Sequence, residues 1–230
     1  MPGIYLISIL IFGVSFLAST MLKRRFQQYS EIPLNLTGKE VAERMLYENG
    51  IHDVKVVAVG GALTDHYNPA TKTVNLSDWV YAQANVAAAA VAAHECGHAV
   101  QHATAYNWLT MRSKLVPVVQ FSSNIVQWII MGGLAVLAFT KGQVPWVLLL
   151  GIILFAITTL FSFITLPVEF DASARAIQWI DRSGIMPSKD LGKAKNALNW
   201  AASTYVIAAL GSLVTLLYYI SIFMGGRRRD

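Results

Sequence analysis

The residues HECGH at positions 94–98 combine the residue types of a zinc hydrolase at a helical spacing. Residues four apart on a helix lie on one face, about 6 Å apart along the axis, so His94 and His98 can bind one zinc ion together. Glu95, next to the first histidine, can reach a water molecule at that ion and act as its general base. The pattern therefore predicts a zinc centre capable of hydrolysis. The alternative is a pair of hydrogen-bonded core histidines beside an ion-paired glutamate.

A catalytic zinc ion takes three protein ligands and keeps one position open, so the chain must supply a third ligand. His102 continues the spacing of the motif, but on a straight helix it lies about 12 Å along the axis from His94. Glu169 is the better candidate, although an acid at the start of a helix is also simply stabilising. Asp171 lies two residues further on. We expect one of these two acids to bind zinc and the other to orient a ligand histidine.

The composition indicates a membrane protein, because the chain is 55% hydrophobic and only 13% charged, against roughly 25% charged residues in soluble domains. Four charge-free segments reach the roughly 20 apolar residues that a helix needs to cross a bilayer. The expected organisation is a first span at 3–22, a metallopeptidase domain at 23–114, a two-helix hairpin at 115–168, extramembrane helices at 169–198, a last span at 199–224 and a basic tail at 225–230.

The segment that contains HECGH shows helix and strand signals of a small α+β domain. Thr37 and Glu40 have the spacing of a capping box, and residues 54–59 and 73–76 predict short strands. The alanine-rich run at 79–93 is too short for a span and predicts a buried helix that continues into the motif. The expected fold class is mainly α, an integral membrane protein with four transmembrane helices and a small α+β zincin-like metallopeptidase domain.

Two short helices are expected between the third and fourth spans. Pro167 suits the first turn of a helix, which would include Glu169 and end near Gly184. Another short helix would begin around Ser188.

The topology of the spans tests whether the proposed ligands can meet. Two spans separate His98 from Glu169, so both residues must lie on the same side of the membrane. Most basic residues outside the spans belong to that side, and the positive-inside rule then makes it the cytoplasm. The arginines at 227–229 disagree, because four spans leave the tail on the other side.

The stretch DHYNP at 65–69, the HECGH motif and the stretch PVEFDA at 167–172 together resemble the YugP-like neutral zinc metallopeptidases of bacteria. The resemblance extends over nearly the whole chain and implies a multi-pass protein of the bacterial inner membrane. By that resemblance His94, His98 and Glu169 bind Zn²⁺ and Glu95 is the catalytic base. The chain is more distantly similar to HtpX-type membrane proteases, gluzincins in which an aspartate follows the ligand glutamate by four residues. Here that position is Ser173, so the residues around the ligands do not carry over directly.

The expected activity is that of a membrane-bound zinc endopeptidase, acting on protein or peptide substrates at or near the surface of the lipid bilayer. The strand at 74–76, exposed at a sheet edge, would hold an extended peptide by strand addition. His66 or Tyr67 would stabilise the oxyanion, although a structural role is the simpler reading of each. No nucleic-acid motif is visible, and nothing indicates an oligomer. The alternative function is a non-catalytic zinc-binding membrane adaptor or assembly factor.

Overall fold

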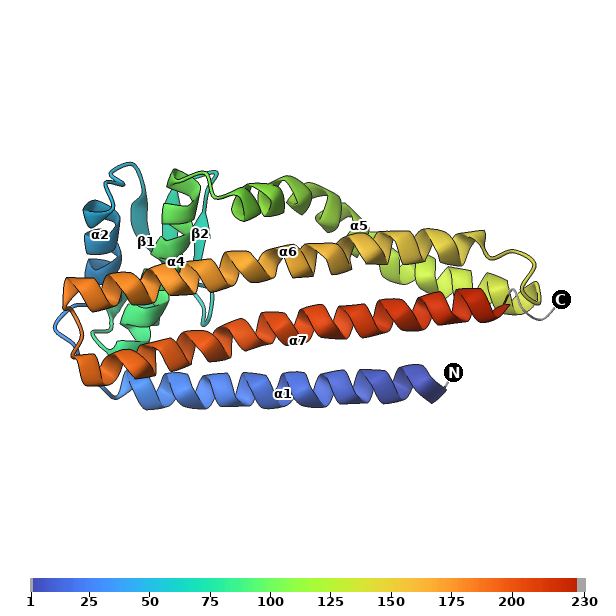
Figure 1. Ribbon diagram of the computed structural model, residues 1–230, viewed down its shortest axis with the longest axis horizontal. Coiled ribbons are helices and arrows are strands. Elements are labelled where there is room, and N and C mark those ends of the chain that lie inside the picture. The colour runs from blue at the N-terminus through green and yellow to red at the C-terminus, as the bar shows by residue number, and fades with distance from the viewer. Residues whose placement is uncertain (1, 227–230) are drawn as a thin grey trace. The chain divides into compact units, whose positions relative to one another are not determined.

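The computed structural model describes residues 2–226, so the arginines of the basic tail lie outside the described residues. Helices dominate the fold, and three short strands form a small mixed sheet (Figure 1). The elements in chain order are α1 (Pro2–Ser30), α2 (Gly38–Glu48), β1 (Lys55–Val59), β2 (His66–Asn68), β3 (Thr73–Ser77), α3 (Asp78–Ala82), α4 (Val86–Ala103), α5 (Asn107–Phe139), α6 (Trp146–Ser183) and α7 (Ser188–Gly226). The predicted mainly helical fold class is confirmed.

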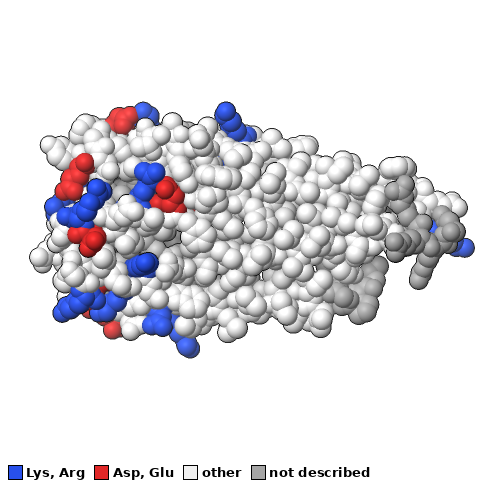
Figure 2. Space-filling view, in the orientation of Figure 1, with Lys and Arg blue, Asp and Glu red and all other residues white. Residues whose placement is uncertain are grey.

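The chain divides into two compact units. The span unit consists of residues 1–16, 111–165 and 205–230, and the site unit consists of residues 17–110 and 166–204. Among the described residues, four helices are long and apolar enough to cross a membrane, namely α1, α5, α6 and α7. In Figure 2 the visible surface of the span unit is mostly uncharged, whereas acidic and basic side chains gather on the site unit.

The span unit contains closely packed helices with apolar outer surfaces. A Cβ atom on Gly133 of α5 would lie 2.6 Å from the Leu148 Cα atom of α6, so glycine permits this close approach of two helices. Leu6, Ile9 and Phe12 of α1 are each at least 70% exposed. Such a surface is unfavourable in water and suits a lipid environment.

The site unit contains the sheet, in the order β1-β3-β2, with β3 parallel to β1 and antiparallel to β2. The prediction of an exposed edge at residues 74–76 is wrong, because these residues belong to the central strand and Val74 and Leu76 are fully buried. The edge strand on one side is β2, a short polar segment next to Pro69. Its composition resembles a turn, and only pairing with β3 makes it a strand.

The alanine-rich run forms two helices where one was predicted. α3 ends at Ala82, and Asn85 caps α4 by accepting a hydrogen bond from the Ala88 amide at 2.9 Å. α4 contains the whole HECGH motif, and most of its residues are buried. The prediction of a buried helix that continues into the motif is therefore confirmed, and only its start is wrong. The capping box of Thr37 with Glu40 at the start of α2 is also present.

The two short helices expected after the third span are parts of longer ones. α6 runs without interruption from Trp146 to Ser183, with Pro167 inside it, and α7 runs from Ser188 to Gly226. Proline removes one backbone donor, but packing on both sides can maintain the helix. Glu169 is therefore an interior residue of α6, so stabilisation of a helix N-terminus does not explain its presence.

Candidate metal centre

α4 and α6 bring three potential metal ligands together inside the site unit. The Nε2 atom of His94 lies 3.3 Å from Oε2 of Glu169, and Nε2 of His98 lies 3.7 Å from the same oxygen. Among the described residues, these three side chains form a group whose ligand atoms all lie within 4.8 Å of one another. The side chains of His94, His98 and Glu169 are 14%, 9% and 3% exposed, so His94 is the most accessible of the three.

The spacing of these atoms suits a zinc ion. Ligands at about 2.0–2.2 Å from a tetrahedral zinc ion lie roughly 3.3–3.6 Å from one another. The distances of 3.3 and 3.7 Å from the Glu169 oxygen are close to this spacing. Two imidazoles and one carboxylate are also a donor set of catalytic zinc sites, which leave a fourth position open. The residues therefore fit the metal.

Two small residues of the motif allow α4 to lie directly against neighbouring elements. A Cβ atom on Gly97 would lie 2.5 Å from the Ala172 carbonyl oxygen of α6, so glycine is needed for this contact. The thiol of Cys96 is fully buried and donates a hydrogen bond to the Ala42 carbonyl at 3.5 Å. Burial raises the pKa of this thiol well above its ordinary value, so Cys96 packs as a small neutral side chain.

The Nδ1 atom of each of these two histidines also has a side-chain partner. Nδ1 of His94 lies 3.1 Å from the Ser173 hydroxyl, and Nδ1 of His98 lies 3.0 Å from the side-chain oxygen of Gln101. Such contacts orient ligand histidines. The sequence reasoning did not assign either partner, but spacing contained a signal for both. Ser173 lies one helical turn after Glu169, and Gln101 lies three residues after His98 on the same helix.

Asp171 does not belong to the group of potential ligands. Its Oδ2 atom accepts hydrogen bonds from Gln101 Nε2 at 2.8 Å and from Arg175 Nε at 2.6 Å. Of the two acids considered, only Glu169 faces both histidines. Asp171 is linked to His98 through Gln101.

Glu95 follows His94 directly on α4 and is 8% exposed. The backbone amide of Tyr67 in β2 donates a hydrogen bond to Oε2 of Glu95 at 3.0 Å. Sequence patterns could not predict this contact, because backbone donors become available to a side chain only through tertiary structure. The edge strand therefore orients the carboxylate that was predicted to be the general base.

The side chains of His66 and Tyr67 have structural partners. Nδ1 of His66 lies 2.7 Å from the Thr64 carbonyl, and the Tyr67 hydroxyl lies 2.7 Å from Nδ1 of His102. Neither side chain belongs to the group of potential ligands. Their predicted role at an oxyanion stays a prediction.

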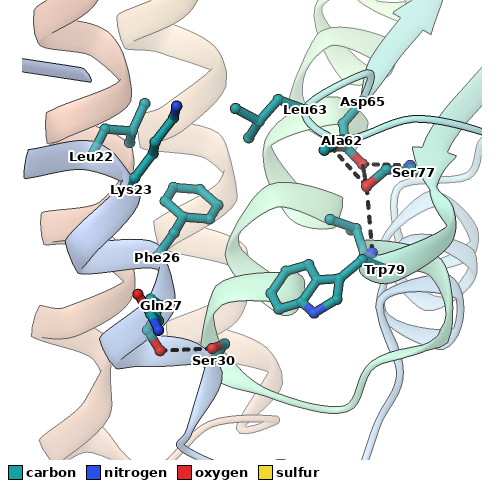
Figure 3. A pocket seen from close by; sticks show the side chains of 11 residues that line it. Leu22, Lys23, Phe26, Gln27, Ser30, Ala62, Leu63, Asp65, Ser77 and Trp79 are labelled. Carbon is teal, nitrogen blue, oxygen red and sulfur yellow. Dashed lines mark hydrogen bonds between the residues drawn. The ribbon is translucent and has the colours of Figure 1, made fainter. Parts of the chain in front are cut away.

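A half-buried carboxylate contact anchors the segment that leads into β2. Asp65 accepts hydrogen bonds from the Ser77 amide at 2.7 Å and from the Ser77 hydroxyl at 3.1 Å (Figure 3). An apolar pocket of about 310 Å³ is lined by the end of α1, by Ala62, Leu63 and Asp65, and by the junction of β3 with α3. Figure 3 draws the side chains of this lining. None of the potential metal ligands lines this pocket, so it is a separate feature of the site unit.

The electrostatics of the centre favour positive charge at His98. Burial by itself lowers the pKa of His98, but hydrogen bonding and negative charge from Glu169, together with the charge of Glu95, outweigh burial and raise this pKa. A group of side chains that attracts a proton in this way also attracts a metal cation.

Comparisons with known proteins agree with this geometry. A family model described as "Putative neutral zinc metallopeptidase" matches residues 4–224. The chain is similar to the "Putative membrane protease YugP" of Bacillus subtilis (strain 168), with 41% identity over 223 residues, which is 96% of each chain. No solved structure matches the chain. Both similarities extend across the span unit and the site unit.

Proposed function

The chain belongs to the neutral zinc metallopeptidase family, and we propose that it is a membrane-bound zinc endopeptidase that cleaves protein substrates at or near the membrane surface. The observation that supports this most is that the potential ligand atoms of His94, His98 and Glu169 lie within 4.8 Å of one another. Glu95 follows His94 directly on α4. We assign the three ligands to zinc and the role of general base to Glu95.

The chemistry divides between the metal and the chain. Zinc, when bound, polarises a carbonyl and lowers the pKa of water. Glu95 accepts the proton of the attacking water and then delivers it to the leaving amine. The Tyr67 amide holds one oxygen of Glu95, so the other oxygen is oriented for this transfer.

The outer edge of β2 is the proposed position of the substrate, in place of the strand at 74–76. The Tyr67 amide is directed towards Glu95, away from its partner Val74 in β3. An extended peptide that lies along this edge would pass close to the proposed base, while the Tyr67 amide stays bonded to Glu95.

The decisive experiment compares the full-length protein with its Glu95→Gln variant in detergent or nanodiscs. We expect one zinc ion per chain in both proteins and a loss of peptide cleavage of about 10²–10⁴-fold in the variant. Glu43→Gln is the matched control, because the same change on an exposed glutamate of α2 should leave both values unchanged. Unchanged cleavage by Glu95→Gln would reject the mechanism. Zinc binding without cleavage in the wild type would favour the adaptor function.

We also propose that the metal centre faces the cytoplasm. Cysteines introduced at Lys72 and Lys189 should react with a membrane-impermeant reagent only after the cells are opened, and one at Lys141 should react in intact cells. Cys96 needs no removal, because it is buried and its pKa is raised. The opposite labelling pattern would reverse the orientation.

A further inference from the structure

Gln101 is a fully buried polar residue of α4, and its amide connects three different partners. Its Nε2 atom donates to the Val168 carbonyl at 2.8 Å and to Oδ2 of Asp171 at 2.8 Å. Its Oε1 atom lies 3.0 Å from Nδ1 of His98. An amide group has two N–H donors, and both are used on α6.

The direction of these hydrogen bonds follows from the chemistry of the partners. The Val168 carbonyl can only accept a hydrogen bond, and Asp171 acts as an acceptor because Arg175, always protonated, donates to the same oxygen at 2.6 Å. The reverse orientation of the Gln101 amide would place its oxygen against two acceptors. The oxygen must therefore face His98, and Nδ1 of that ring must donate to it.

The consequence concerns the other nitrogen of the same ring. With the proton on Nδ1, the Nε2 atom of the neutral His98 ring has a free lone pair, directed towards the Glu169 carboxylate at 3.7 Å. A lone pair and a carboxylate repel each other unless a cation lies between them. His94 differs, because its Nδ1 meets the Ser173 hydroxyl, which can either donate or accept.

We propose that Gln101 is a positioning residue that sets the tautomer and ring orientation of His98, so that Nε2 is the nitrogen available for metal binding. Asp171 and Arg175 act as the anchor that fixes the direction of the Gln101 amide. The inference rests on the proposed metallopeptidase function, since it assigns His98 to the metal. It deepens that function, because it makes one ligand ready for the metal before the metal binds.

The first test measures the zinc dissociation constant of the folded full-length protein in detergent by competition with a chelator. Gln101→Leu retains a similar volume but removes both hydrogen-bonding groups, and we expect about 10–100-fold weaker zinc binding. Asn85→Ala is the matched control, since Asn85 is also a buried polar residue and its side chain caps the start of α4. It should lower the midpoint of thermal unfolding without changing the zinc dissociation constant. Wild-type affinity in folded Gln101→Leu would overturn the proposal.

The second test needs no zinc binding, and the Gln101 variant plays no part in it. Isotope-labelled histidine nitrogens, observed by NMR in the metal-free wild type at a pH where the ring is neutral, report which nitrogen of His98 has the proton. We expect the proton on Nδ1, and His98→Gln identifies the signal by its loss. A proton on Nε2 would overturn the proposal even if the protein proves to be an active peptidase. A proton on Nδ1 in a protein that does not cleave peptides would support it while the proposed function fails.

Discussion

Hydroxyl groups of the span unit mostly bond within their own helix, with the contact between the Ser162 and Ser212 hydroxyls as an exception, whereas several polar side chains of the site unit bond to distant segments. In the span unit, Thr159 donates to the Phe155 carbonyl and Thr215 donates to the Gly211 carbonyl, each within its own helix. In the site unit, the hydroxyl of Tyr29 contacts Asn196, 167 residues away in the sequence. The contacts of Gln101 with α6 and of Tyr67 with Glu95 are similarly distant.

The two units therefore meet different physical requirements. Helices in lipid need hydroxyl groups that are satisfied locally, because no water is available to replace a lost partner. A metal centre needs side chains from several elements within about 0.5 Å of the correct geometry, and only contacts between elements give that precision. We therefore expect substitutions in the site unit to have large effects on binding and stability, and matched substitutions in the span unit to have small ones.

The largest effect is expected at the third ligand. Glu169→Ala removes the oxygen that faces both histidines and should abolish stoichiometric zinc binding. Asp171→Ala should weaken zinc binding by only about 10–100-fold, because Asp171 acts on His98 through Gln101. Metal analysis after dialysis, followed by chelator competition, measures both variants. Full zinc content in Glu169→Ala would contradict its assignment as a ligand.

A smaller but clear effect is expected where α4 meets α6. Gly97→Ala places a Cβ atom 2.5 Å from a backbone oxygen, which should destabilise the protein by about 1–3 kcal/mol and weaken zinc binding as α4 shifts. Gly132→Ala is the control in the span unit, because no neighbouring atom lies within 4 Å of its added Cβ. Thermal unfolding in detergent should show a loss for the first variant only. Equal midpoints of thermal unfolding for the two variants would mean that α4 and α6 accommodate the added methyl group without a loss of stability.

The smallest effects allow the most direct comparison of the two units. Asp65→Ala leaves the buried Ser77 amide without a partner and should cost about 1–3 kcal/mol of unfolding free energy. Thr159→Val removes a hydroxyl that bonds only within α6 and should cost about 0.6 kcal/mol or less. Denaturant titration in a fixed detergent measures both. A larger loss of unfolding free energy for Thr159→Val would contradict the proposed difference between hydrogen bonds within one helix and hydrogen bonds between distant segments.

Features that depend on local spacing could be predicted from the sequence. The HECGH spacing identified two ligand candidates and one candidate base on the same helix, and the length of the charge-free segments identified four helices suited to a membrane. The even number of spans between His98 and Glu169 was enough to predict that they could meet. Helix boundaries around Pro167 were less predictable, because proline can either start a helix or be accommodated inside one.

The sequence by itself determined which side chains could bind a metal. Residue type decides which atoms can be ligands, and the helical period decides which of them lie on one face of a helix. Only the tertiary structure decided that Glu169, with Asp171 set apart from it, faces the two histidines, and that β2 is the strand beside Glu95. It also decided that Ser173 and Gln101 contact the Nδ1 atoms of His94 and His98. The physical reason is that hydrogen bonds and close contacts between distant segments depend on how α4 packs against α6, and this packing has no signature in any single stretch of sequence.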